Sequence, residues 1–406
     1  MQYISRTALS SLTGCGEDQL LQFEAAGIIG RKTDYLLEDA DRIRVALALH
    51  EAGISLDTLA KAIRNKVFAL DFAAQIMFDP VYLSTTSMER ALDGSDVTPI
   101  TLNNLRAAAG LPRLSTEQVL REDDVELLNL ITECRRLGIS DLAMTRVLRA
   151  FGQSTHRVVE TMRDLFRSEV EERMLNAGIP HAQMLDAAAA KRLELQRIGF
   201  KVLFMLQRRL LEESVFDNIV SRIQEALCES GLETGPDVDL PTVAFADLCG
   251  FTELTHELGD MKAAEQAARF EAFTQQIVSH VGGRLVKVLG DGVMVLFPEP
   301  TAGLTACLTL VDSAEEAGLL PVRVGLVTGQ VVPRDGDIFG QTVNLAARIT
   351  SVANPAQVVV SESAMVAVAT NNPEMFSFAA LEPTVLKGLP GRFCLFSAEI
   401  ASSYES

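Results

Sequence analysis

The sequence has no tryptophan, no C-x-x-C pair and no long uncharged apolar run. Its six cysteines are scattered, which indicates free thiols in a reducing compartment rather than a disulfide framework. No stretch approaches the about 18 apolar residues of a membrane-spanning helix, and the N-terminal residues lack the basic segment and apolar core of a secretory signal. These absences predict a cytoplasmic protein without a membrane span.

Basic residues are also scarce. The chain carries 36 Lys and Arg against 54 Asp and Glu, a formal net charge of −18. Nucleic-acid binding needs a basic surface, so this composition disfavours nucleic acid as a partner. Residues 241–406 hold only nine of the basic residues, and each of these is therefore a stronger candidate for a specific role.

The length predicts two or three domains, and the first 230 residues differ in pattern from the rest. They have apolar residues at three- and four-residue spacing and little β-branched alternation, which predicts an all-α region. We expect helices at 36–52, 125–137, 158–177 and 195–211, with breaks at Gly53, Gly138, Gly152 and Gly178-Ile179-Pro180.

This helical region contains a weak internal repeat. Residues 38–63 align with residues 123–148, and each copy reads as an acidic pair, an amphipathic helix, Gly-Ile-Ser and a second helix. The serine at the start of the second helix is a good N-cap. A duplicated helix–turn–helix is the natural interpretation.

A segment rich in glycine, proline and acidic residues, 228–241, ends the helical region and predicts an interdomain linker. Beyond it, helices and strands mix, and an antiparallel hairpin is expected around Gly290-Asp291-Gly292. This mixture predicts an α+β sandwich. The expected strands are 242–246, 284–289, 293–297, 322–328, 357–361 and 392–398, and the expected helices are 260–281, 301–317 and 342–352.

Two carboxylates stand at strand ends in this second region. Asp247 closes the first strand, and Asp291 lies in the hairpin turn. If those strands are neighbours, the carboxylates meet at one rim of the sheet, where their repulsion calls for Mg²⁺ or Mn²⁺. Such sites usually serve phosphates. The alternative is that Asp291-Gly292 only makes the turn.

A second pair lies on a helix. Asn344 and Arg348 are four residues apart and therefore project from the same helix face. Arginine offers a planar charged fork suited to phosphate oxygens, and asparagine can bond a ribose oxygen. The alternative is a polar pair on the surface of an amphipathic helix.

Taken together, these motifs match a known family. Residues 241–398 resemble the class III nucleotidyl cyclase catalytic domain, with the signature positions in the right order. The resemblance implies a ferredoxin-like α/β sandwich in which Asp247 and Asp291 bind two Mg²⁺ or Mn²⁺ ions per active site. The matching motifs are 245–252, 287–292, 337–348 and 386–388.

The resemblance also implies roles for the other site residues. Lys287 and Asp337 match the pair that selects adenine, and a Lys donor with an Asp acceptor complements the adenine edge. Asn344 and Arg348 match the pair that orients the ribose and stabilises the transition state, and Lys387 matches a lysine that binds the polyphosphate. The implied reaction is attack of the ribose 3′-hydroxyl of ATP on the α-phosphate, which yields cyclic AMP and pyrophosphate.

In this family the active site lies between two catalytic domains, and one chain here carries both halves. We therefore expect an obligate homodimer whose isolated monomer is inactive. Gln341 stands where many members have asparagine, with little expected consequence. The segment between Thr328 and Asp337 is short, which places loop-based dimer contacts in doubt.

Residues 115–230 resemble the helical regulatory domain fused to actinobacterial cyclases, including pH-responsive ones. This implies that the helical region controls the cyclase, with His156 and His181, near predicted helix ends, as candidate sensors and surface histidines as the alternative. A small regulatory ligand or a lipid is a candidate partner. The apolar helix 198–211 is interpreted as a buried dimer helix, with a lipid pocket as the alternative.

The first 65 residues are similar to the winged helix of MerR-type regulators, a module that binds DNA. Arg31 and Lys32 would lie in its wing, yet little other basic charge supports DNA binding. A structural or dimerising module is favoured. The competing hypothesis for the whole chain is a catalytically silent nucleotide sensor or a DNA-binding regulator. The expected domains are 1–110, 111–230 and 242–400, with a linker at 231–241.

Overall fold

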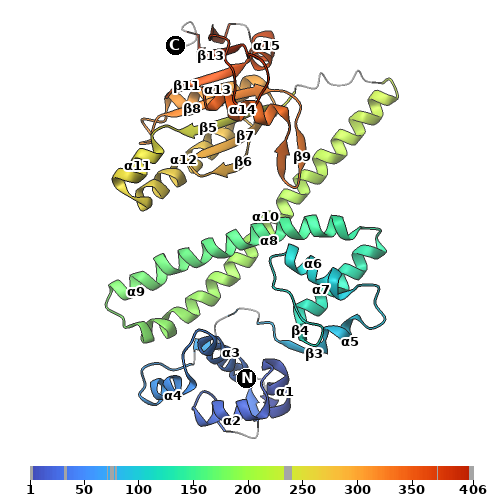
Figure 1. Cartoon of the computed structure of the whole chain (residues 1–406), viewed down its shortest axis with the longest axis vertical. Helices are drawn as coiled ribbons and strands as arrows, with labels where there is room; N and C mark the ends of the chain where they lie inside the picture. The colour runs from blue at the N-terminus through green and yellow to red at the C-terminus, as the bar shows by residue number, and fades with distance from the viewer. Residues whose placement is uncertain are drawn as a thin grey trace. The chain divides into compact units, whose positions relative to one another are not determined.

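The computed structural model describes residues 3–31, 34–70, 72–73, 77, 80–232, 240–372 and 374–401. The chain divides into two compact units, Met1–Ile223 and Gln224–Ser406, and each is described by itself (Figure 1). No helix within these described ranges is long and apolar enough to cross a bilayer. Lys32 and most of the predicted linker (233–239) lie outside them.

The first unit contains the predicted repeat, and each copy is larger than the sequence indicated. A copy consists of a strand, two helices, a second strand that pairs antiparallel with the first, and two more helices. The first copy is β1 (Tyr3–Ser5), α1 (Arg6–Thr13), α2 (Glu17–Ala25), β2 (Asp34–Leu36), α3 (Leu37–Glu51) and α4 (Leu56–Arg64). The second is β3 (Leu83–Ser87), α5 (Met88–Leu92), α6 (Pro99–Ala108), β4 (Val119–Arg121), α7 (Glu122–Arg136) and α8 (Asp141–Phe166).

Equivalent side chains begin equivalent helices in the two copies. Asp39 and Asp124 each accept a hydrogen bond from the backbone amide three positions earlier, at 2.9 and 3.3 Å. Ser55 and Ser140 each accept one from the amide three positions later, at 3.1 and 3.3 Å. These caps satisfy amides that a helix start leaves without partners, which explains why the acidic pair and the serine recur.

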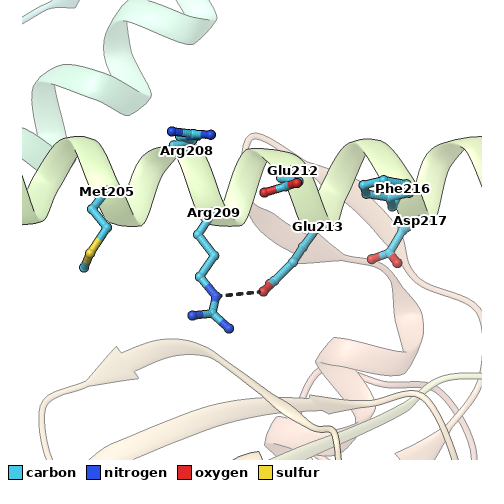
Figure 2. A pocket seen from close by; sticks show the side chains of 7 residues that line it. All are labelled: Met205, Arg208, Arg209, Glu212, Glu213, Phe216 and Asp217. Carbon is cyan, nitrogen blue, oxygen red and sulfur yellow. Dashed lines mark ion pairs between the residues drawn. The ribbon is translucent and has the colours of Figure 1, made fainter.

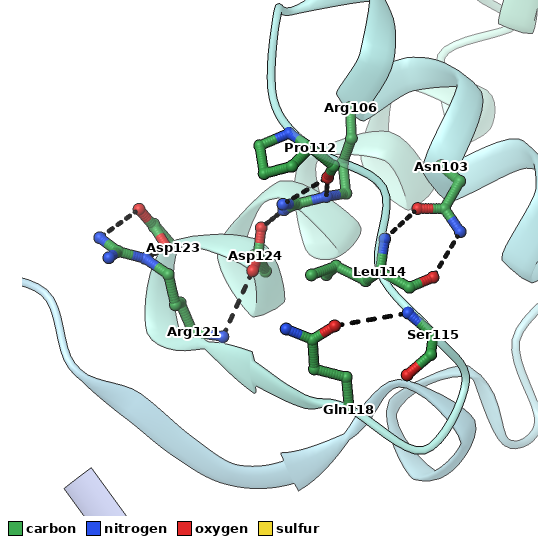
Figure 3. Close-up of polar contacts among 9 residues, drawn as sticks. All are labelled: Asn103, Arg106, Pro112, Leu114, Ser115, Gln118, Arg121, Asp123 and Asp124. Carbon is green, nitrogen blue, oxygen red and sulfur yellow. Dashed lines mark hydrogen bonds and ion pairs between the residues drawn. The ribbon is translucent and has the colours of Figure 1, made fainter. Parts of the chain in front are cut away.

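The second copy also contains a buried ion pair, which Figure 3 shows. Arg106 of α6 pairs with Asp124, and both side chains are 5% exposed. The Arg106 guanidinium also donates to the carbonyl oxygen of Pro112 at 3.0 and 3.1 Å. Burial lowers the pKa of Arg106. A buried charge of this kind depends on its partner, so the pair fixes α6 against α7.

The end of the first unit is a pair of long helices. α8 continues through a π-helical segment, η2 (Arg167–Glu171), into α9 (Glu172–Asn176), and α10 spans His181–Glu229. The predicted break at Gly178-Ile179-Pro180 is confirmed because it separates α9 from α10. The predicted break at Gly152 is wrong, since Gly152 lies inside α8. A Cβ there would lie 2.5 Å from the carbonyl oxygen of Ala109, so the glycine permits close packing rather than ending the helix.

The second unit is an α+β sandwich, as predicted. Its seven-stranded sheet has the order β12-β13-β11-β8-β5-β7-β6. The strands are β5 (Thr242–Leu248), β6 (Arg284–Leu289), β7 (Gly292–Phe297), β8 (Val322–Thr328), β11 (Gln357–Ser361), β12 (Phe376–Ala380) and β13 (Leu395–Ile400). The helices are α11 (Phe251–Leu258), α12 (Asp260–His280), α13 (Pro300–Asp312), α14 (Gln341–Thr350) and α15 (Glu362–Asn371). A separate hairpin consists of β9 (Val332–Arg334) and β10 (Asp337–Phe339).

Alternation along the strands gives the sheet two different faces. On β5, Ala244, Ala246 and Leu248 join a core with residues of α12, α13 and α15, whereas Val243 joins a second core with residues of α14. Successive strand residues point to opposite faces, so Asp247 lies on the α14 face. The same alternation on β8 places Arg323 on that face.

Candidate active site

Asp247 and Asp291 meet at one rim of the sheet, as the strand pattern predicted. β5 and β7 are antiparallel neighbours with Asp247 opposite Gly292, and the Leu248 amide donates to the Asp291 carbonyl oxygen at 3.1 Å. A Cβ on Gly292 would lie 3.2 Å from Asp247 Oδ1, so the bare glycine leaves room for that carboxylate. Gly290 has a φ of 73°, which suits glycine in the turn.

Arg323 is a site residue that the sequence analysis missed. It lies directly opposite Asp247 on β8, and its Nε donates to Asp247 Oδ2 at 3.0 Å. This hydrogen bond raises the pKa of the Arg323 guanidinium. The available signal was one basic residue in the otherwise apolar strand Val322–Thr328, on the same face as Asp247.

Lys287 and Asp337 form an ion pair inside one chain (the predicted adenine-selecting pair). Lys287 comes from β6 and Asp337 from the first position of β10. The Ile338 amide also donates to Asp337 Oδ1 at 2.9 Å. Burial alone would raise the pKa of Asp337, but the hydrogen bonds from Lys287 and Ile338 and the charges of Lys287 and Arg284 lower it below its ordinary value.

The two residues predicted to share a helix face, Asn344 and Arg348, both lie on the exposed side of α14. Asn344 and Arg348 are exposed, while Ala346 and Ile349 of the same helix are fully buried against the sheet. Lys387 is exposed in the connection between β12 and β13. The side chains that are predicted to act on the nucleotide therefore come from β6, β10, α14 and this connection.

The donor set at the rim fits a hard divalent cation that keeps open positions. Within the described residues, no group of three or more His, Cys, Asp and Glu could enclose a metal. Mg²⁺ is usually bound by one or two carboxylates together with substrate phosphates and water. Asp247 and Asp291 supply two carboxylates and leave the remaining positions to such ligands.

The two candidate sensor histidines, His156 and His181, occupy different positions in their helices. His181 is the first residue of α10, near a helix end as predicted. His156 is not near an end, because α8 runs without a break from Asp141 to Phe166. Of the two predicted wing residues, Arg31 is described and Lys32 lies outside the described residues, and α2 contains no Lys or Arg.

A largely apolar cavity of about 340 Å³ lies between α8 and α10. Val158, Met162 and Phe166 line it from α8, and Leu195 and Leu203 line it from α10. The predicted dimer helix thus forms part of a cavity wall, and its other residues are largely exposed.

Residues 236–397 match the family model described as the adenylate and guanylate cyclase catalytic domain. An adenylate cyclase of Glutamicibacter nicotianae is 30% identical over 290 residues, which cover 69% of this chain and 70% of that protein. A pH-sensitive adenylate cyclase of Mycobacterium tuberculosis is 27% identical over 381 residues, covering 88% and 87%. The crystal structure of the adenylyl cyclase CyaB from P. aeruginosa is 20% identical, with a TM-score of 0.36, and covers 40% of this chain and 95% of that one.

The match with the G. nicotianae enzyme extends well outside the catalytic domain, because 290 residues exceed the span of 236–397. The family model covers the residues that hold the four sequence motifs and almost all of the seven-stranded sheet, and the longer match includes part of the helical unit as well. The chain belongs to the class III adenylate cyclase family, and its second unit contains the catalytic domain.

Proposed function

We propose that this chain converts ATP to 3′,5′-cyclic AMP and pyrophosphate at sites shared by two copies of the chain. The observation that carries the proposal is the Lys287–Asp337 ion pair, which is already formed in one chain. Adenine presents an acceptor at N1 and a donor amine at N6, and this pair offers a donor and an acceptor in return. Guanine presents the reverse pattern and would leave these groups unpaired, so the pair favours ATP over GTP.

Asp247 and Asp291 would hold two Mg²⁺ or Mn²⁺ ions. When bound, the ions supply acidification of the ribose 3′-hydroxyl and charge neutralisation on the polyphosphate. Arg323 holds the Asp247 carboxylate in a fixed orientation through the hydrogen bond from its Nε.

The remaining roles follow from side-chain chemistry. Asn344 would bond the ribose and orient its 3′-hydroxyl toward the α-phosphate. Arg348 would donate to the α-phosphate oxygens, where charge develops in the transition state. Lys387 would neutralise the leaving pyrophosphate. No side chain in this set is assigned as a general base.

Exposed apolar side chains support a homodimer. Val288, Leu289, Val332 and Phe339 flank the Lys287–Asp337 pair and are 38–61% exposed. Apolar patches beside a polar site mark surfaces that a partner covers. A second copy that covers this patch would bring its own Asp247 rim toward the pair.

A second exposed apolar surface lies on α10. Leu211, Val215, Ile219 and Ile223 follow at four-residue intervals and are 47–61% exposed. Figure 2 shows charges of both signs on the same stretch, and Arg209 pairs with Glu213 at 3.5 Å. A helix with an apolar stripe and mixed charges suits packing against its own copy, and we propose that α10 contributes to the dimer.

We further propose that the helical unit, including the proposed modules 1–110 and 111–230, controls the catalytic unit. Its similarity to a pH-sensitive relative supports pH as one signal. His181, the first residue of α10, is the candidate sensor in this proposal. The apolar cavity between α8 and α10 is a candidate site for a small ligand or lipid.

The test is cyclic AMP formation by the purified chain with ATP and Mn²⁺ or Mg²⁺. We expect product from the full chain and none from Asp247→Ala. No product under either metal would refute the proposal. Deletion of residues 1–230 should change the activity or its pH response, and an unchanged profile would refute the regulatory role.

A further inference from the structure

The first turn of α14 is attached to the segment that follows β8. Thr342 Oγ1 donates to the carbonyl oxygen of Gln330 at 2.6 Å, and Thr342 is buried. Thr342 precedes Asn344 by two residues and Arg348 by six. Its hydroxyl therefore holds the first turn of α14, beside Asn344, whereas Arg348 lies in the last turn of the same helix.

The close approach at this point depends on a glycine. A Cβ on Gly329 would lie 2.7 Å from Thr342 Oγ1, a separation that real Cβ atoms do not show. Only bare backbone next to Gln330 lets the threonine reach the carbonyl oxygen. The two positions form one local contact between β8 and α14.

The same segment is bonded to the place where the linker becomes β5. The Gly329 amide donates to the Pro241 carbonyl oxygen at 3.0 Å. The hydroxyls of Thr242 and Thr328 are hydrogen-bonded at 2.7 Å, and both residues are buried. Residues 328–330 therefore contact the end of the linker on one side and α14 on the other.

The other end of α14 is attached to β5. Thr350 Oγ1 shares its proton between the carbonyl oxygen of Ala346 in the same helix, at 2.9 Å, and that of Phe245, at 3.2 Å, two residues before Asp247. A Cβ on Gly325 would lie 2.3 Å from the Thr350 amide nitrogen, so α14 rests directly on the β8 backbone (Figure 1). With this end fixed, the Thr342 contact sets the orientation of the helix.

We infer that Thr342 is a positioning residue for Asn344 and Arg348, and that residues 328–330 make this position depend on how the linker joins β5. The inference rests on the proposed roles of Asn344 and Arg348. Thr342 acts through the helix that it holds. A shift of Pro241 and Thr242 would move residues 328–330 through their hydrogen bonds to Gly329 and Thr328. It would then move α14 through the bond from Thr342 to Gln330.

The test is the steady-state kinetics of full-length Thr342→Val and Thr342→Ser. Valine keeps the shape and removes the hydroxyl, so kcat should fall about tenfold while KM for ATP changes less than about twofold, because misplaced groups act on the transition state. Serine restores the donor and should return kcat to within about threefold of wild type. A loss confined to KM, or no rescue by serine, would overturn the inference.

Thr305→Val is the matched control. Thr305 Oγ1 donates to the Thr301 carbonyl oxygen at 2.9 Å inside α13, which packs on the face of the sheet opposite α14. The variant removes the same kind of donor without touching residues 328–330 or α14, and it should leave kcat unchanged. An equal fall in kcat for both variants would show that Thr342 is only structural.

Hydrogen exchange gives a reading that does not depend on cyclase activity. Thr342→Val should speed exchange of the α14 amides at 341–348, and Thr305→Val should not. Unchanged α14 exchange would overturn the inference even if the enzyme is active. Absence of cyclic AMP from the wild type, with the predicted exchange change, would instead refute the proposed function alone.

The dependence on the linker is tested by Thr242→Val combined with Thr342→Val in the full chain. Effects that act through one contact are not additive. Thr242→Val alone should lower kcat about threefold, and the double variant should lose no more than Thr342→Val alone. A combined loss equal to the product of the two single losses would overturn the linker dependence.

Discussion

The two units of this chain solve the burial of apolar residues differently. In the catalytic unit, the central strands are buried on both faces, and the polar residues of interest lie at a rim and on the outer face of α14. In the helical unit, each repeat copy has its own small core, while α10 leaves a long series of apolar residues exposed. The comparison teaches that the positions of the proposed site residues follow from the fold of one chain, whereas the helical unit leaves apolar helix surface exposed.

The largest expected effect concerns the carboxylates of the catalytic unit that are proposed to bind metal. Asp247→Ala should lower kcat by about 10³-fold or more, because the charge clamp on the phosphates is lost. Cyclic AMP formation measures it, with the exposed Glu382→Ala as a control carboxylate that should leave kcat unchanged. Near-normal activity of Asp247→Ala would contradict the proposal that Asp247 binds a catalytic metal ion.

The next effect is on the stability of the helical unit. Asp124→Ala removes one partner of the buried ion pair with Arg106 and should cost about 3–5 kcal/mol in the free energy of unfolding. Asp123→Ala breaks the half-exposed pair with Arg121 and should cost at most about 1 kcal/mol. Equal costs in denaturant unfolding would show that burial does not distinguish the pairs.

A smaller effect is expected on nucleotide choice. Replacing Lys287 by Glu and Asp337 by Cys exchanges the donor and acceptor pattern and should lower the ATP-to-GTP preference in kcat/KM by about 10²-fold. Competing ATP and GTP turnover measures it. A double variant that keeps the wild-type preference would remove the observation on which the proposed substrate rests.

A charge on the apolar stripe of α10 should weaken dimerisation. Leu211→Asp buries a charge in the proposed helix contact and should raise the dimer dissociation constant about tenfold. Glu212→Gln is a control on the same turn that adds no charge to the stripe. Sedimentation that shows equal dimerisation of Leu211→Asp and wild type would argue that α10 is covered by something other than a second copy.

The smallest effect concerns pH. The pKa of Asp337 is lowered, so its ion pair with Lys287 is fully present above the ordinary carboxylate pKa and is lost only as the pH falls through the lower folded value. The ATP-to-GTP preference should therefore stay constant from about pH 5.5 to 8. A preference that titrates inside this range would contradict the assignment, whereas a change in total rate would point to the helical unit.

Most of the candidate site residues could be predicted from the sequence. The strand end and the hairpin turn pointed to Asp247 and Asp291, and four-residue spacing put Asn344 and Arg348 on one helix face. Lys287, Asp337 and Lys387 were singled out only by the resemblance to the cyclase family. Arg323 was missed because its importance comes from pairing across β5 and β8, and register between distant strands is not visible in local sequence.

The helical unit was harder to predict for a related reason. Gly152 was read as a helix break, although its role is to admit Ala109, a residue distant in sequence. The first half of each repeat copy was missed because its two members share architecture more than residues. His156 was placed near a helix end for the same reason as Gly152: the break before it does not exist.

The central claim is that one chain contains both halves of a site that only two copies complete. The direct test mixes two inactive variants, Asp247→Ala and Arg348→Ala, under conditions that allow subunit exchange. Random pairing gives about half heterodimers, each with one intact site, so about a quarter of wild-type activity should return. A mixture that stays as inactive as either variant alone would contradict the shared site.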